Sequence, residues 1–412
     1  MSLPYARPVP EITDLPVVDM SDPAFWSDIH TPLREARAEA PLARTPSGDV
    51  IILGHGEVEQ FLRDPSMRTT DLLATNGLDS GPLHEWWSRV MFSTDPPDHT
   101  RLRRLVSRAF TPQRVDSLVP TIGVIADAVL APHLERGEMD LLGDYAHHLP
   151  IRVMGYLLAI PEEDFDRFAD WTADLGLVFS AIVDPDLRTR LEHSYLALDS
   201  YVRELVERRR RAPGDDLLSA LVAAEEAGER LTTDELVAMV ANLLFAGHDT
   251  TRSYLSIALP LLLSHPEQLG ALRADPMLLA SAAEECLRFE PPVMGSSRTP
   301  SQDVEIGGVT LRAGRAVSVS LPAANRDPEA FVDPDTFDIA RFVDVTARPS
   351  AIASFGHGVH FCLGAALARA EGRVGLERVL ARLDAVELVE PLEWVPYAHI
   401  RRYRRVPVRF GV

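Results

Sequence analysis

The sequence predicts a mainly helical protein with a small β region. Most of residues 100–285 follow a helical pattern of apolar positions. From about residue 291 to 345 short β-like pieces alternate with glycine and proline, and a long helical pattern returns after Cys362. Because no shift in composition marks a linker, we expect residues 1–412 to form a single domain.

The individual elements can be taken in chain order. Residues 1–16 contain four prolines and are expected to form an extended arm. Val50–Leu53 is a candidate strand, with glycines marking a turn before the helix that follows. The clearest break in the helical stretch is Arg211–Asp216. Further strands are expected at Val304–Ile306, Val309–Leu311, Ala316–Leu321 and Val406–Phe410.

Charge and cysteine content exclude several classes of function. The net charge of −20 argues against a nucleic-acid partner, because phosphate binding requires a basic surface. Two cysteines, Cys286 and Cys362, cannot form a disulfide framework for a chain of this length, and no C-x-x-C pair suggests zinc. Any chemistry at a cysteine therefore involves one thiol acting alone.

The apolar segments predict a cytoplasmic protein without a membrane anchor. The longest apolar stretch, Tyr254–Leu263, is shorter than the roughly 20 residues that span a bilayer, and it contains Pro260. The N-terminus lacks a charged segment followed by an apolar one, so no signal peptide is expected.

One cysteine lies in a glycine-rich loop that precedes a helical pattern. The segment Ser354–Gly364 reads SFGHGVHFCLG, with three glycines around Cys362. Glycine permits positive φ and close approach to the backbone, which a flat cofactor lying on a loop requires. A helix start also favours a thiolate. The alternative is a small buried hydrophobe, the usual role of a lone cysteine, but the length of the pattern disfavours it.

A long helix with a polar segment at its centre is predicted from Thr233 to about Ser264. Thr232 and Glu235 have the spacing of a capping box. The residues Leu236–Phe245 are apolar, and Ala246–Thr251 then reads AGHDTT. Polar groups inside an apolar helix are costly unless they have partners, so we expect a groove there. A solvent-facing turn of a surface helix is the alternative, which the apolar flanks disfavour.

Charged residues form two further patterns. Glu285 and Arg288 lie at i, i+3 on one helix face, a spacing that is usually surface decoration. In the segment Asp95–Arg108, His99 and Arg103 fall within about 40° of each other on a helical projection. The remaining arginines of that segment lie on the opposite face, as they would on a solvated helix. These are Arg101, Arg104 and Arg108.

Together these motifs resemble the cytochrome P-450 superfamily, the haem-thiolate monooxygenases, in its soluble bacterial, actinomycete-like type. The resemblance spans about residues 90–410 and includes Ala323–Pro328. It implies a mostly helical triangular prism, with haem b (iron protoporphyrin IX) buried between the long central helix and the helix of the cysteine loop.

The resemblance also implies roles for individual residues. Cys362 is the proximal iron ligand, with Phe355 packed near the sulfur and Gly364 closing the motif. His360, His99, Arg103 and Arg298 bind the haem propionates. Ala246 and Gly247 face the haem and leave room for O2. Thr250 donates a hydrogen bond to the bound dioxygen, and Asp249, where many family members have glutamate, relays protons. Glu285, Arg288 and Arg341 form a buried ion network that holds the haem loop.

The implied reaction inserts one oxygen atom of O2 into a hydrophobic molecule, by hydroxylation or epoxidation, in secondary metabolism. Because the haem domain uses the whole chain, electrons are expected from a separate ferredoxin and its NAD(P)H-dependent reductase, docked on the outward arginines. Two alternatives remain, a peroxide-driven haem-thiolate enzyme and a non-catalytic haem sensor. The presence of Asp249 and Thr250 disfavours both.

A hydrophobic substrate is expected because the candidate pocket lining is apolar throughout. Each of these residues is an equally good candidate for plain core. The candidates are Met91, Phe92, Leu177, Val178, Phe179, Leu243, Leu244, Val293, Met294 and Ile400.

Overall fold

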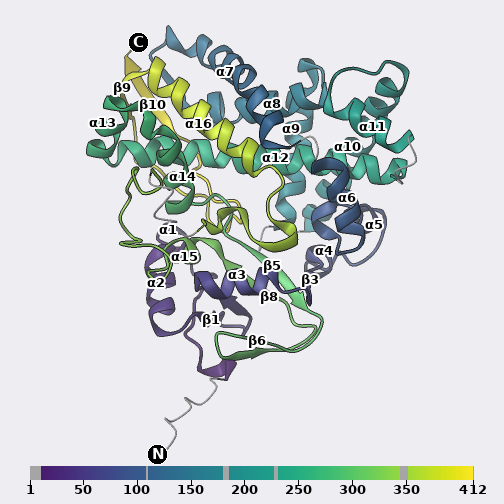
Figure 1. Cartoon of the computed structure of the whole chain (residues 1–412), viewed down its shortest axis with the longest axis vertical. Coiled ribbons are helices and arrows are strands. Elements are labelled where there is room, and N and C mark those ends of the chain that lie inside the picture. Colours follow the sequence, from purple (N-terminus) through teal and green to yellow (C-terminus); the bar gives the residue numbers. More distant parts are fainter. Residues whose placement is uncertain (1–10, 108–109, 180–184, 227–230, 344–350, 412) are drawn as a thin grey trace, which may run out of the picture. The chain divides into compact units, whose positions relative to one another are not determined.

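A computed structural model of the protein describes residues 11–107, 110–179, 185–226, 231–343 and 351–411. The mainly helical fold with a minor β part is confirmed (Figure 1). The chain divides into two compact units, each assembled from three chain segments. Unit 1 comprises residues 1–70, 294–336 and 350–361, and unit 2 comprises residues 71–293, 337–349 and 362–412. The single domain expected from the sequence stays a prediction.

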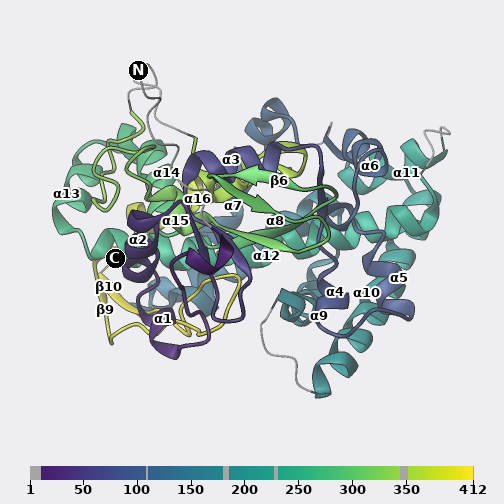
Figure 2. The ribbon, with the colours of Figure 1, turned by 90° about the horizontal axis from the view of Figure 1, so that it is seen from below.

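Unit 1 contains a five-stranded sheet in the order β1-β2-β8-β5-β3. Strands β2 and β8 pair in parallel, and the other neighbouring pairs are antiparallel. Helix α3 (His55–Arg63) contacts β3 and also lies beside β6 (Val304–Ile306), as Figure 2 shows. The strands of the sheet are β1 (Leu42–Arg44), β2 (Val50–Ile52), β3 (Met67–Thr69), β5 (Gly295–Pro300) and β8 (Val317–Ser320). The remaining elements are the hairpin β6 (Val304–Ile306) and β7 (Val309–Leu311), with α1 (Pro23–Ser27), α2 (His30–Glu39) and α15 (Leu321–Asn325).

Unit 2 contains most of the helices and a three-stranded antiparallel sheet in the order β4-β10-β9. Its strands are β4 (Glu138–Asp140), β9 (Asp384–Leu388) and β10 (Pro407–Gly411). Its helices begin with α4 (Leu72–Thr75), α5 (Pro82–Trp87), α6 (Asp98–Ser107), α7 (Pro112–Leu134), α8 (His148–Leu158) and α9 (Phe165–Gly176). They continue with α10 (Pro185–Arg211), α11 (Leu217–Glu226), α12 (Thr233–Leu263), α13 (Pro266–Ala274), α14 (Leu279–Phe289) and α16 (Ala365–Arg382).

Helix α12 forms the core of unit 2, because most of its residues are buried on all sides. The predicted capping box is present: the Thr232 side chain accepts from the Glu235 N–H at 3.2 Å, and the Glu235 carboxylate accepts from the Thr232 N–H at 2.9 Å. Helix α16 packs along α12 at two glycines, Gly372 against Tyr254 and Gly375 against Leu255. On its other side α16 lies beside α7 (Figure 1).

The structure corrects the expectation for the N-terminal arm. Residues 1–10 of the expected extended arm lie outside the described residues, and Ile12–Asp14 forms a 3-10 turn rather than extended chain. One described helix, α7, is also long and apolar enough on average to cross a membrane. That helix carries Asp127, which pairs with Arg378 and Arg382 of α16. A core helix passes the same test, so a single such helix is weak support for a membrane span.

Candidate active site

The polar segment of α12 opens onto a space at the middle of the helix. Ala246 is exposed, and Gly247 and Thr250 are half-buried, while the residues on both sides are buried. We call these three residues the notch. The helix stays α-helical through it, and the Thr250 hydroxyl donates to the Ala246 carbonyl at 3.0 Å. A Cβ at Gly247 would lie 2.8 Å from the sulfur of Met154, so the flexible Met154 side chain would have to move.

Asp249 is buried and held by two arginines. It pairs with Arg252, one turn further along α12, and with Nη1 of Arg402 at 3.5 Å. Arg252 in turn donates from Nη1 to Nδ1 of His147 at 3.4 Å. Burial lowers the pKa of the Arg252 guanidinium, and the charge of Asp249 opposes that shift. The expected acid is therefore present, with its charge compensated from two sides.

Cys362 lies three residues before the first residue of α16, and its sulfur accepts a hydrogen bond from the Gly364 N–H. Arg103 and Arg369 place positive charge near the sulfur. Burial nevertheless raises the pKa of the Cys362 thiol, and this outweighs the N–H bond and the two cations. The start of the helix was expected to favour the thiolate form of Cys362. In the protein chain by itself, desolvation outweighs that effect and favours the neutral thiol.

The first part of the glycine loop lies in unit 1. Gly356 and Gly358 have φ of +64° and +72°, which confirms the expected need for glycine at these positions. Gly364 has φ of −84°, so positive φ is not the reason for glycine there. The buried Asn325 anchors the loop: its Nδ2 donates to the Ser354 hydroxyl at 2.7 Å, and its Oδ1 accepts from the Ala353 N–H at 2.6 Å.

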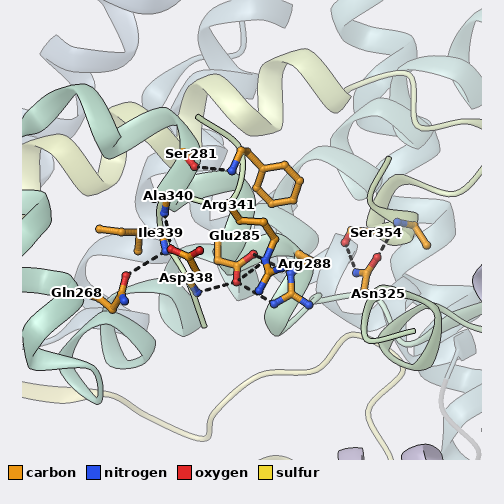
Figure 3. Close-up of polar contacts among 12 residues, drawn as sticks. Gln268, Ser281, Glu285, Arg288, Asn325, Asp338, Ile339, Ala340, Arg341 and Ser354 are labelled. Carbon is orange, nitrogen blue, oxygen red and sulfur yellow. Dashed lines mark hydrogen bonds and ion pairs between the residues drawn. The ribbon is translucent and has the colours of Figure 1, made fainter. Parts of the chain in front are cut away.

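The structure brings Glu285, Arg288 and Arg341 together, as Figure 3 shows. The segment that carries Arg341 is also tied to the neighbouring helices. The Asp338 N–H donates to Glu285 at 2.8 Å, and the Phe342 N–H donates to the Ser281 hydroxyl at 3.0 Å. The network exists as expected, and its role in holding the haem loop stays a prediction.

The residues assigned to the propionates are divided between the units. In unit 2, His99 is buried in α6, and Arg103, on the same helix, lies close enough to Cys362 for their charges to interact. In unit 1, Arg298 lies on β5, and His360 ends a short 3-10 turn that starts at Gly358. Phe355 also lies in unit 1, where its ring is 6.4 Å from that of Phe361.

The outward arginines of α6 differ from one another. Arg101 pairs with Glu235, which also caps α12. Arg101 therefore links α6 to α12 and does not face an electron-carrier protein. Arg104 is exposed, and Arg108 lies outside the described residues.

The candidate pocket residues separate into groups. Leu177, Phe179 and Ile400 line a cavity of about 250 Å³ beside Asp249. Phe92 and Phe179 join an aromatic cluster, with their rings 6.1 Å apart, and Ile400 pairs through its backbone with Val293. Met294 belongs to unit 1. The others are buried in unit 2, namely Met91, Val178, Leu243 and Leu244.

Sequence reasoning missed several residues of this region. Phe245 and Trp87 complete the aromatic cluster, and Phe245 stacks on Phe179 with their rings 5.7 Å apart. The i, i+4 spacing of Phe245 and Asp249 could have placed Phe245 on the same face of the helix as Asp249. The i, i+3 spacing of Asp249 and Arg252 could likewise have predicted their ion pair. Nothing in the sequence pointed to Arg402, which is far from Asp249 along the chain.

Comparisons with known proteins agree with this geometry. The model of the family "Cytochrome P450" matches residues 172–392. Vitamin D(3) 25-hydroxylase of Pseudonocardia autotrophica is 39% identical, over 95% of this chain and 96% of that protein. Cytochrome P450 monooxygenase PikC of Streptomyces venezuelae is 38% identical, over 96% and 94%. The crystal structure of CalO2 superposes with a TM-score of 0.90 at 32% identity, covering 96% of this chain and 99% of that one.

The relatives extend over nearly the whole chain, so the match is not confined to the short motifs of the loop and the central helix. The chain therefore belongs to the cytochrome P450 family and is a haem-dependent monooxygenase.

Proposed function

We propose that Cys362 ligates the haem iron and that the enzyme inserts one oxygen atom of O2 into a hydrophobic small molecule. The observation that carries this proposal is the notch. Ala246 is exposed in the middle of a helix whose flanking residues are buried, so the chain provides an opening there without a side chain to fill it.

The residues present suit a haem. Ala246 and Gly247 offer a small apolar face, and the Cys362 sulfur has a backbone N–H donor and two nearby arginines. His99, Arg103, Arg298 and His360 would hold the propionates, since cationic groups suit carboxylates. Phe355 and Gly364 would complete the loop around the sulfur. When bound, the haem supplies the activation of O2 and the transfer of one oxygen atom.

Asp249 and Thr250 would deliver protons at the notch. The Thr250 hydroxyl lies on the open face of α12, where it can turn from the Ala246 carbonyl towards a ligand. Asp249 is one residue away and reaches the cavity that opens beside α12. Arg252 and Arg402 pair with this carboxylate and would hold it in place beside Thr250.

Electrons would come from a separate ferredoxin and its NAD(P)H-dependent reductase, in the cytoplasm. The exposed Arg104 on α6 would be accessible to an acidic carrier. The relative named for vitamin D(3) hydroxylation supports a hydrophobic small molecule as the substrate. The relative named 6-deoxyerythronolide B hydroxylase supports a place in secondary metabolism.

The first test concerns the sulfur. The carbonylated ferrous protein should show the red-shifted absorption of a sulfur-bound haem, and C362S should lose it. C286A is the matched control, because Cys286 is buried beside the Ala258 carbonyl in the core. Loss of the band in both variants, or in neither, would contradict the assignment.

The second test separates the alternatives. Product should form with ferredoxin, reductase and O2, and T250V should lower the product formed per NAD(P)H consumed. The control T251V makes the same change on the buried side of α12. Turnover with peroxide alone, and none with the electron carriers, would favour the peroxide-driven enzyme. Haem binding without turnover in either assay would favour a sensor.

A further inference from the structure

The cavity beside Asp249 has an unusual lining for a protein of this charge. It occupies about 250 Å³ within unit 2, between the end of α9, the start of α10, α12 and the loop of residues 395–402. The chain carries a net charge of −20, yet three arginines line this cavity, Arg190, Arg252 and Arg402. Asp249 is the one carboxylate in its described lining.

The three arginines are not equally engaged. Arg252 is largely buried and pairs closely with Asp249. Arg190 pairs with Asp174 at 2.5 Å but remains half exposed, so its guanidinium can also face the cavity. Arg402 reaches Asp249 only at 3.5 Å, the limit of a hydrogen bond. The three arginines carry three positive charges, and Asp174 and Asp249 together carry two negative charges. One positive charge of this cluster is therefore uncompensated.

The other arginines of residues 401–405 differ from Arg402 in their contacts. Arg401 is buried, stacks on Trp394 at 3.7 Å and pairs with Glu290 at 3.4 Å, so it serves the structure. Arg404 and Arg405 are exposed and pair with acidic residues of the preceding segment. Arg402 alone among these four lines the cavity.

An aromatic surface adjoins the arginines. Phe179 lines the cavity and stacks on His399 at 5.4 Å on one side and on Phe245 at 5.7 Å on the other. Trp87 and Phe92 extend the same cluster. A ligand in the cavity would therefore meet Phe179 and His399, which are backed by this cluster, and the guanidinium groups of the arginines.

We propose that this cavity is an anion subsite, which takes the carboxylate of a substrate whose apolar body packs against Leu177, Phe179 and Ile400. Arg190 and Arg402 bind the carboxylate, since guanidinium groups suit carboxylates in geometry and charge. Arg402 then turns from Asp249 to the substrate, and Asp249 keeps Arg252 as its partner. The inference rests on the proposed function, because it names a chemical group of the substrate of that same site.

Calorimetric titration of the holoenzyme with phenylbutyrate and with its uncharged amide, phenylbutyramide, tests this subsite. The two probes share an aromatic body and differ in charge. The acid should bind at least about tenfold more tightly than the amide, as expected for charged hydrogen bonds. The difference should shrink as salt is added, because Arg190 is half exposed.

Variants locate the subsite. R190Q and R402Q should each reduce the preference for the acid several-fold and leave the amide affinity unchanged. The matched controls are R188Q, on the same helix as Arg190 and paired with Glu192, and R404Q, two residues after Arg402 and paired with Glu393. Both should keep the wild-type preference.

Equal affinities of the wild-type protein for the two probes, or no measurable binding of the acid, would overturn the proposal. So would a loss of preference in the control variants equal to that in R190Q and R402Q. The carbonyl spectrum of the same preparation distinguishes this failure from that of the proposed function. A red-shifted band with equal affinities refutes the anion subsite alone, and a preference for the acid without that band refutes only the Cys362 assignment.

Discussion

The carboxylate of Glu285 accepts hydrogen bonds from Nε and Nη2 of Arg288 at 2.7 and 2.8 Å, and neither side chain has any exposed surface. Nε of Arg341 approaches both oxygens of the same carboxylate at 3.2 Å. One buried carboxylate thus faces two guanidinium groups, so its removal leaves two buried cations without their shared counter-charge.

E285Q should therefore lower the free energy of unfolding by about 3–5 kcal/mol, the usual cost of breaking a buried ion pair from one side. Urea unfolding of the holoenzyme measures it. The control is E192Q on α10, whose partner Arg188 is about half exposed, and its cost should stay below about 1 kcal/mol. Similar losses in the two variants would show that burial does not strengthen the Glu285 network.

Local patterns allowed much of this fold to be predicted. The α12 boundaries followed from the capping box at Thr232 and Glu235 and from the apolar run, and the helix ends at Leu263, one residue before the predicted Ser264. Glu285 and Arg288 are one helical turn apart, so their pairing was also local. The short strands between glycines and prolines were placed for the same reason.

Contacts between distant segments could not be predicted in the same way. Arg402 meets Asp249 only because the loop of residues 395–402 packs beside α12, and no spacing records that packing. Asn325 anchors Ser354 within unit 1, whereas the sequence analysis assigned the support of the loop to the network of Glu285, Arg288 and Arg341. The division into two compact units could not be predicted, because each unit is built from separate segments and no single linker marks a boundary.

The pairing of Arg101 with Glu235 predicts a role for α6 in retaining the haem. E235Q should keep the capping box, because the amide oxygen still accepts the Thr232 N–H, but it loses the charge that holds Arg101. Since α6 carries His99 and Arg103, haem transfer to apomyoglobin should be several-fold faster, with a stability loss of only about 1 kcal/mol. D234N, which loosens the exposed pair with Arg203, should leave the transfer rate unchanged.

His248 of α12 and the neighbouring His147 predict how the stability of the protein depends on pH. Desolvation, followed by the charge of Arg252 and the nearby His148, lowers the pKa of His147 to about 4, with Asp166 and Asp249 opposing. Burial also places the pKa of His248 well below its usual value. Both rings are neutral in the folded protein and bind protons on unfolding below about pH 6.5. Stability should therefore fall as pH drops from about 6.5 towards 4.

Urea unfolding at several pH values in this window measures the slope. H147F removes one of the two rings that must charge, so its stability should depend less on pH. H193Q, on the exposed face of α10, should keep the wild-type slope. An equally steep slope in H147F would show that the ring is not held neutral by its surroundings.

Alanine substitution should have opposite effects on stability at two glycines. Gly372 lies in the contact between α12 and α16, and Gly270 lies on α13. In G372A the new Cβ would overlap the ring of Tyr254, which cannot swing away because its hydroxyl donates to the Ala283 carbonyl at 2.8 Å. The two helices must separate, at a cost of about 2–3 kcal/mol. In G270A, on α13, nothing lies within 4 Å of the new Cβ, and the loss of chain entropy in the unfolded state should stabilise the protein by about 0.5–1 kcal/mol.

The same variants test whether the helix contact positions the cysteine. Because α16 begins just after Cys362, a shift of α16 away from α12 should also move the sulfur relative to the notch. G372A should therefore weaken or broaden the red-shifted carbonyl absorption, whereas G270A leaves it intact. A destabilised G372A with an unchanged spectrum would show that the position of Cys362 is set by its own loop and not by the contact of α16 with α12.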